Sequence, residues 1–599
     1  MNAVFGATIL LVALVITPGW LFYFDVTPKL VILLAGAAGA CVWAAARGWG
    51  GAGRAYRLFG WLLTASAAWL AISTWLSRNP ALSAFGTNWR RFGAVPQVAL
   101  MAFAWLLAGY TSGRLDRARA VLRYFVPAAG IAGLYGIAQY FGWDPLLPAG
   151  AYHVGKGVWT IVRPPGTLGY VSYFATFLVG SAFLCVWVAR AEAGVWRIAA
   201  YASAAVAAVA MLLTGTRAAM FALALGGALW LWARGARVPR RVLLVGAAVA
   251  AAGAAFYFLP AGQQMRSRAR WFAEDPWGGS RLLLWRDGLR MAAHRPLLGY
   301  GAEVFTAEFP QFESTELARN YPDFVHESPH NMFLDALIAE GVPGLILLVG
   351  VVGLGLWSSR RDAELLGALV AVVVAQQFTV FVLPTALLMM VIIAVGVGQN
   401  SEAAERRRSS GAMRLAFAAA AVLFAYCLAR YGVADRELAQ SSASLARADA
   451  GAAARFYSEY DRWRMPGTSA ALWYSRAQLT LASTGANPLT KIQALAQAGA
   501  AADRATRESE DPCNAWYNAA AIYATQNDFA HTEGALRSAI HANPHWFKPH
   551  WTLAQVLALS GRAGEAEREA ALAVDLDGGK HAEVVATLRS LRGQAALHR

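Results

Sequence analysis

Long apolar stretches recur along the chain at intervals that predict membrane-spanning helices. FGATILLVALVITPGWLFYF, from Phe5, and RVLLVGAAVAAAGAAFYFLP, which ends at Pro260, are two examples. Each has about 20 residues, enough to cross a hydrocarbon core of about 30 Å as a helix. About thirteen such spans are expected, beginning near residues 3, 28, 58, 92, 120, 168, 196, 218, 241, 332, 363, 381 and 413. The pattern therefore predicts an all-α fold, a polytopic membrane helix bundle of about thirteen spans.

The last part of the chain has a different pattern, rich in alanine with interspersed charge. AWYNAAAIYATQNDFAHTEGALRSAIHANP and HWTLAQVLALSGRAGEAEREAALAVDLD align at an offset of 34 residues, so that Ala520 matches Ala554 and Ala539 matches Ala573. This period is typical of tetratricopeptide helix pairs, which offer a binding groove and no chemistry. A plain helical bundle is the alternative.

These patterns divide the chain into four expected parts. Spans one to nine occupy residues 1–260, a large external loop 261–330, spans ten to thirteen 331–433, and an external α-helical repeat domain 434–599. We expect the repeats to bind a protein or polysaccharide partner.

The charge distribution predicts the topology. Only 15% of the residues are charged and the mean hydropathy is +0.40, whereas soluble proteins carry about a quarter charged residues. Every second loop is rich in arginine, and such loops face the cytoplasm. The N-terminus is therefore expected in the cytoplasm and the C-terminus outside. Because much of the net charge of +16 lies in these loops, it does not indicate a nucleic-acid partner.

A few arginines lie on the opposite, external side of this topology. Arg90, Arg163, Arg217 and Arg281 are in loops expected outside, and Arg217 has almost no loop around it. A charge at the membrane edge is costly without a partner. Guanidinium groups bind phosphate oxygens in pairs, so a lipid pyrophosphate head group is the expected ligand. Snorkelling to the interface is the alternative, and for Arg91 a surface position or a contact with lipid head groups is expected.

The segment HESPH, residues 326–330, matches the zinc motif H-E-x-x-H. A zinc site of this kind needs both histidines on one face of a helix. Pro329 disfavours a helix through the segment, and Ser328 followed by Pro329 predicts a helix N-cap and first residue. We therefore expect no metal and no cofactor, with His330 in the first turn of span ten. A neutral imidazole there can exchange a proton with a hydroxyl group.

Five segments of the chain match short motifs of one known family. They are H-N-x-x-L…E-G-x-x-G-L from His330, GGSRLLLWRDGLRMAAHRPLLGYG, LLTGTRAAMFAL, RPPGTLGYVSYFATFL and FGTNWRRFG. Taken in their order along the chain, which is the reverse of this list, the segments resemble the bacterial O-antigen ligase and polymerase superfamily. Thr216 stands where serine is usual, and Tyr170-Val171-Ser172 replaces Asn-Pro-Asn.

The resemblance implies a metal-independent glycosyltransferase in the bacterial inner membrane, with the C-terminal domain in the periplasm. Such enzymes transfer a glycan from undecaprenyl pyrophosphate to an acceptor hydroxyl. Arg217 and Arg281 would hold the pyrophosphate as it leaves, and His330 would orient or deprotonate the acceptor. Arg90, Arg163 and Asn331 would bind the pyrophosphate or the glycan.

The acceptor distinguishes several functions within this superfamily. A ligase transfers to lipid A–core, a polymerase to another lipid-linked glycan, and an O-oligosaccharyltransferase to protein. From a different class, a lipid or glycan transporter is the alternative, although the spans show no internal pseudo-repeat of the kind that transporters have.

Overall fold

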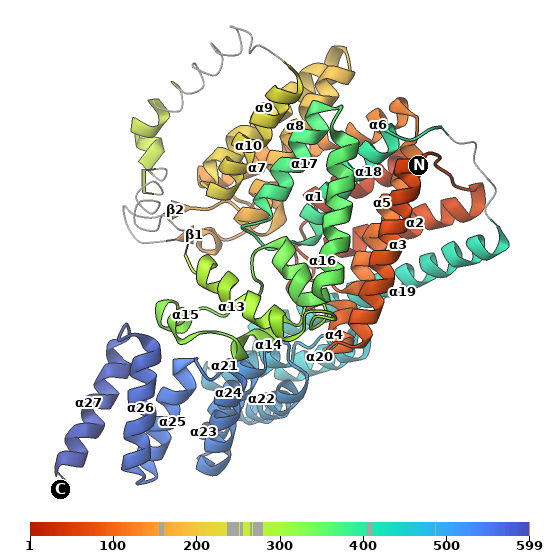
Figure 1. The fold of residues 1–599 in the computed structure, drawn as a ribbon. Helices are drawn as coiled ribbons and strands as arrows, with labels where there is room; N and C mark the ends of the chain where they lie inside the picture. Colours follow the sequence, from red (N-terminus) through yellow and green to blue (C-terminus); the bar gives the residue numbers. More distant parts are fainter. Residues whose placement is uncertain are drawn as a thin grey trace.

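The computed structural model describes residues 1–154, 161–235, 251, 255–263, 266–267, 279–403, 410–484 and 487–597. The fold is almost entirely helical, as the sequence predicts (Figure 1). In the described part of the chain, β1 (His153–Val154) and β2 (Ile161–Val162) form the only sheet, a short antiparallel pair. Three short 3-10 turns, η1 (Ala149–Ala151), η3 (Gly166–Leu168) and η4 (Pro260–Gly262), lie in connections.

Among the described residues, eight helical segments are long and apolar enough to cross a membrane. They are α2 (Thr27–Arg47), α3 (Arg54–Trp75), α5 (Ala94–Thr111), α6 (Leu115–Leu122) with α7 (Phe125–Tyr140), α8 (Val171–Ala191), α9 (Gly194–Leu213), α16 (Met332–Ser359) and α19 (Gly411–Ala446). Four shorter apolar helices accompany them: α1 (Asn2–Leu14), α10 (Arg217–Ala233), α17 (Ala363–Ala375) and α18 (Leu383–Gln399).

These helices support a multi-pass membrane protein. Each lies where the sequence predicts a span, and the expected ninth span, near residue 241, falls outside the described residues. The total of about thirteen spans stays a prediction. Helix α18 is buried at every residue from Leu383 to Gly398. A helix that is apolar all round belongs at the centre of a bundle.

Consecutive connections alternate between the two ends of the bundle. At one end, the Glu402 N–H donates to the Ala52 oxygen (3.1 Å), close to the N-terminus. At the other end, the Met332 N–H at the start of α16 donates to the oxygen of Gln376, directly after α17 (3.1 Å). We call this second end the outer end, since the sequence predicts that it faces the periplasm; the direction in the membrane stays a prediction.

The large loop forms small helices at the outer end. These are α13 (Arg281–His294), α14 (Phe305–Glu308), η5 (Phe309–Gln311) and α15 (Thr315–Asn320), and α4 (Pro80–Phe85) lies beside them (Figure 1). Leu284, Met291 and Phe309 form a small apolar core with Leu334 and Ile338 of α16. The loop therefore packs on the first part of α16.

The C-terminal region forms a row of antiparallel helices against the same outer end, far from the N-terminus (Figure 1). They are α20 (Ala450–Trp463), α21 (Ala471–Thr484), α22 (Pro488–Glu508), α23 (Pro512–Thr525), α24 (Phe529–Ala542), α25 (Phe547–Leu559), α26 (Ala563–Asp577) and α27 (Ala582–Leu597). Helix α26 begins 34 residues after α24, the offset seen in the sequence. The tetratricopeptide assignment itself stays a prediction.

Candidate active site

Arg217 and His330 lie at the same end of the bundle. Arg190, at the end of α8, and Arg234, directly after α10, both pair with Glu364 at the start of α17 (2.7 and 2.8 Å). Helices α8 and α10 therefore end where α17 begins. Arg217, the first residue of α10, is consequently at the outer end, where α17 finishes and α16 starts.

The segment before α16 is not helical, and this corrects one expectation. Residues 324–329 have no regular secondary structure, and α16 begins at Met332 rather than at Pro329. The N-cap is Asn331, whose side-chain oxygen accepts from the N–H groups of Phe333 and Leu334 (both 3.1 Å). Asn331 thereby accepts two of the free N–H groups at the start of the helix, which is the N-cap role that the sequence predicted for Ser328. Asn331 thus has a structural role, and any substrate contact would come from its amide group.

His330 lies outside the helix in a strained conformation. Its φ of +53° is in the left-handed region, which is uncommon for a residue with a Cβ. The Ser328 hydroxyl accepts from the His330 N–H (3.1 Å), and the Trp285 indole of α13 donates to the Pro329 oxygen (2.9 Å). Local strain of this kind persists where the surroundings hold it. Helix α13 therefore fixes the segment that presents His330.

The surroundings of His330 keep its imidazole neutral. Burial lowers its pKa to about 4, and the positive charge of Arg281, together with His326 and Arg90, adds to this effect. Arg281 is the first residue of α13 and is half-buried. The structure thus brings together Arg281, Arg90 and His330, three of the residues that the sequence predicted.

Arg90 is a buried cation that already has two carboxylate partners. Its Nε lies 3.1 Å from Glu303 Oε1, and its Nη2 pairs with Asp335 of α16. The Phe381 oxygen accepts a further hydrogen bond (3.1 Å). Burial alone would lower the pKa of Arg90, but Asp335 and Glu303 raise it. These ion pairs neutralise its charge internally and favour a role for Arg90 in organising the site; its expected contact with the pyrophosphate or the glycan stays a prediction.

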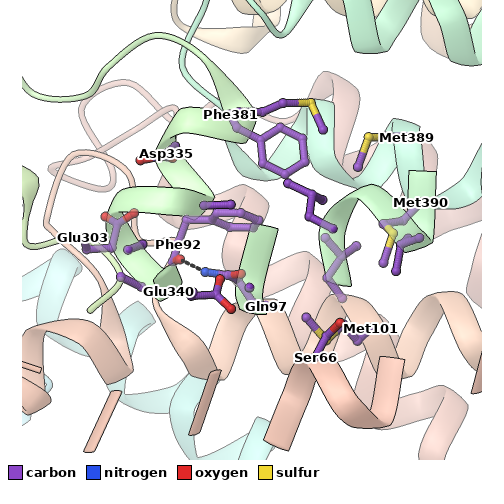
Figure 2. Close-up of a pocket in the computed structure, with 18 of the residues that line it drawn as sticks. Ser66, Phe92, Gln97, Met101, Glu303, Asp335, Glu340, Phe381, Met389 and Met390 are labelled. Carbon is purple, nitrogen blue, oxygen red and sulfur yellow. Dashed lines mark hydrogen bonds between the residues drawn. The ribbon is translucent and has the colours of Figure 1, made fainter. Parts of the chain in front are cut away.

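A cavity of about 110 Å³ opens beside this ion-pair network, between α3, α5, α16 and α18. Figure 2 shows Glu303 and Asp335 on one side of the cavity, and Met389 and Met390 on the other. Gln97 lines it too and donates to the Phe92 oxygen (2.8 Å). Most of the remaining lining is apolar: Leu63, Leu100, Met101, Leu348 and Val351. The cavity is therefore amphipathic, with its charged side at the outer end.

The first part of α16 is held by a break in the helix. Gly341 has a φ of +69°, and a Cβ there would lie 2.3 Å from the Leu297 oxygen. The loop segment 296–301 supplies backbone partners across the break: Tyr300 N to Ile338 O (2.9 Å), Gly301 N to Ala339 O (2.9 Å) and Val342 N to Pro296 O (2.7 Å). The P-L-L-G-x-G and E-G-x-x-G segments thus bind each other and position Asp335.

Other sequence expectations fare differently. Arg163 follows β2, where its N–H donates to the Tyr152 oxygen (3.0 Å); its Nε is buried without a hydrogen bond among the described residues. Arg91 is only 4% exposed and pairs with Asp435 (2.9 Å), so the expected surface position is wrong. Asp335 was missed, although a carboxylate at the start of a membrane span is itself a signal of function.

The HESPH segment does not form the helix that a zinc protease requires. His326 Nε2 lies 3.8 Å from Glu313 Oε1 instead. Within the described ranges, no group of three His, Cys, Asp or Glu side chains is placed to hold a metal ion.

The site coincides with a region of known similarity. Residues 202–349 match the O-antigen ligase family model. The matched region contains Arg217, Arg281 and His330. The exopolysaccharide production protein ExoQ of Rhizobium meliloti (strain 1021) is 27% identical over 245 residues, which are 39% of this chain and 52% of that protein. The chain therefore matches about half the length of this curated relative. Both similarities support the resemblance to the O-antigen ligase superfamily.

Proposed function

We propose that the protein is a membrane glycosyltransferase that moves a glycan from undecaprenyl pyrophosphate to an acceptor hydroxyl. The observation that supports this best is the position of His330 close to Arg281, at the outer end of a helix bundle and within the segment similar to O-antigen ligases. A membrane-embedded diphosphate would place its charge at this depth.

In the proposed reaction, the acceptor oxygen forms a bond to the anomeric carbon as the bond from that carbon to the pyrophosphate oxygen breaks. Arg281 and Arg217 stabilise the negative charge that develops on the leaving pyrophosphate. His330 accepts the hydroxyl proton. Burial is the largest cause of the lowered His330 pKa, and Arg281 adds to it. The approaching diphosphate would offset the part that comes from Arg281 and so raise the basicity of His330 to that extent.

The acceptor separates two candidate functions. The first candidate is a ligase, the activity that the description of the family model names, and it would transfer the glycan to a lipid A–core acceptor. The relative named for exopolysaccharide production favours a second candidate, a polymerase whose acceptor is another lipid-linked glycan. The test also includes a protein acceptor, for the O-oligosaccharyltransferase alternative, and it distinguishes glycosyl transfer from transport.

The experiment measures release of undecaprenyl pyrophosphate from lipid-linked glycan by the purified protein, with a chelator present. Wild type is compared with His330→Ala and with His531→Ala, an exposed histidine of α24 as the matched control. Chelator-resistant release that is lost only in His330→Ala supports the proposal, and supplying each acceptor in turn identifies the function. Release that stops with chelator contradicts metal independence. No release with any donor or acceptor would favour a transporter.

A further inference from the structure

The segment that carries Arg90 is a closed loop, residues 86–93, which we call the Arg90 loop. Gly86 has a φ of +87°, and a Cβ there would lie 2.6 Å from the Phe92 nitrogen. A Cβ on Gly93 would lie 2.5 Å from the Gly86 nitrogen. Only glycine allows this approach of the two ends. The residues between the glycines therefore project outward from one compact turn.

Part of the Arg90 loop faces the large loop and α16. The N–H and hydroxyl of Thr87 both donate to Glu303 Oε2 (3.1 and 2.5 Å), and Arg90 pairs with Glu303 and Asp335. The Glu303 carboxylate thus accepts hydrogen bonds from Thr87 and forms an ion pair with Arg90. These contacts alone would leave the other side of the loop unsupported.

The C-terminal helices hold that other side. The Asn88 N–H donates to Oε2 of Glu510, which precedes α23 (2.9 Å). The Asn88 amide donates to the oxygen of Ser469, which precedes α21 (2.9 Å). Arg91 pairs with Asp435, in the second half of α19. Asn88 and Arg91 are each only 4% exposed, so these contacts lie inside the molecule.

The same junction contains a shared apolar core. Phe22 and Tyr23, from the connection between α1 and α2, pack against a cluster that includes Tyr457 and Tyr474 of the C-terminal region. The rings of Phe22 and Trp473 are 4.6 Å apart. A Cβ on Gly467 would lie 2.3 Å from the nitrogen of Leu82 in α4. Backbone of the C-terminal region thus rests on the helix that leads into the Arg90 loop.

We propose that the C-terminal helices are a built-in part of the active site, and that Glu510 and Asn88 are positioning residues that set the direction of Arg90. This inference rests on the proposed function, because its readout is glycosyl transfer. It differs from the expectation of a separable docking module. Removal of the Glu510 carboxyl takes away one of the three contacts that hold this side of the Arg90 loop, and we expect Arg90 with Asp335 then to shift relative to His330.

The Glu510 carboxyl also gives the contact a dependence on pH. Burial raises its pKa to about 8; Glu303, Asp511, Arg91, Tyr23 and Tyr460 are the charged and titratable groups that face it. Below that pH the carboxyl is neutral. Above it, a negative charge forms close to Glu303 and Asp511 and weakens the packing of the loop. Glutamine keeps the acceptor for the Asn88 N–H and cannot ionise.

The test uses the full-length protein and three variants: Glu510→Ala, Glu510→Gln, and Arg319→Ala as control. Arg319 of α15 joins the large loop to the C-terminal helices through Asp575 (2.7 Å), at an exposed edge away from the Arg90 loop. We expect Glu510→Ala to lower kcat/KM for the lipid-linked donor by about 10- to 100-fold, as a misplaced catalytic group does. Glu510→Gln should restore most of this loss, and Arg319→Ala should match wild type. Wild type should lose activity above about pH 8, and Glu510→Gln should not.

Several results would overturn the inference. One is wild-type kcat/KM, per molecule of folded protein, in Glu510→Ala. Should that variant not fold, the dependence of kcat/KM on pH decides. The same loss of kcat/KM at alkaline pH in wild type and in Glu510→Gln rejects the role of Glu510. A loss in wild type that is absent in Glu510→Gln supports that role. An inactive wild type would instead reject the proposed function, so the two failures are distinguishable.

Discussion

The break in α16 predicts a large cost for adding one methyl group at Gly341. In Gly341→Ala, the new Cβ would lie 2.3 Å from the Leu297 oxygen, at a residue whose φ is +69°. With a ψ of −170°, Gly341 lies in a backbone region that essentially only glycine occupies, and a residue with a Cβ there costs about 1–3 kcal/mol. Overpacking costs typically about 1–3 kcal/mol, so the expected loss is about 2–6 kcal/mol. Proteins are stable by only roughly 5–15 kcal/mol.

The same helix offers a matched control. Gly353 is exposed, and a Cβ there would meet nothing within 4 Å. Gly353→Ala should be neutral or stabilise the helix by about 0.5–1 kcal/mol. Thermal midpoints of the purified, detergent-solubilised proteins measure the difference, with size-exclusion profiles after heating as the readout.

The break also links stability to the site, because it places Asp335 against Arg90. We therefore expect the fraction of Gly341→Ala that remains folded to show a lower kcat/KM for the donor. A midpoint equal to that of Gly353→Ala would refute the reasoning, since it would mean that segment 296–301 yields to the methyl group without cost.

Three further predictions concern charged and titratable side chains. Asp335→Ala removes one carboxylate partner of buried Arg90 and should cost about 1.5–3 kcal/mol, the value of a hydrogen bond to a charged group; an unchanged thermal midpoint would contradict this. Because the pKa of His330 is lowered to about 4, kcat/KM should hold from neutral pH down to about pH 5, and an acid limb near the ordinary value of about 6.5 would argue against a buried neutral imidazole. A hydrogen bond to Asp577 raises the pKa of His581. The contribution of this pair to the stability of the fold is therefore complete below the pKa of His581 in the unfolded chain, and is lost as pH rises through its pKa in the folded protein. His581→Gln should remove this part of the pH dependence of the thermal midpoint.

The sequence predicted the helices well because the bilayer constrains them strongly. Backbone groups in lipid must be paired within a helix, and the side chains must be apolar. Each span can therefore be recognised in the sequence as a continuous stretch of apolar residues. The alternation of basic loops likewise indicated which loops share an end. This reasoning predicted that one end of the bundle, the external one, holds Arg217, Arg281 and His330.

Contacts between distant residues were beyond this reasoning. Arg90 and Asp335 are 245 positions apart, and Asn88 and Glu510 are 422 apart. No periodicity links them; the tertiary packing does. The position of Arg91 was wrong for the same reason, because its carboxylate partner lies 344 positions away in α19.

The motif segments separate into those that build the outer end and those that offer chemistry. The glycines of P-L-L-G-x-G and E-G-x-x-G allow two backbones to pair across the break in α16, and Asn331 caps the same helix. These residues hold the first part of α16 in place, and they would be needed whatever the acceptor is. In the proposed reaction, Arg281 and Arg217 would act on the leaving diphosphate of the donor, and His330 on the hydroxyl proton that every acceptor carries. Arg163 stays a predicted ligand of the pyrophosphate or the glycan. Acceptor choice must therefore come from surfaces outside these motifs, which is why the motifs predicted the place of the site and left ligase and polymerase unseparated.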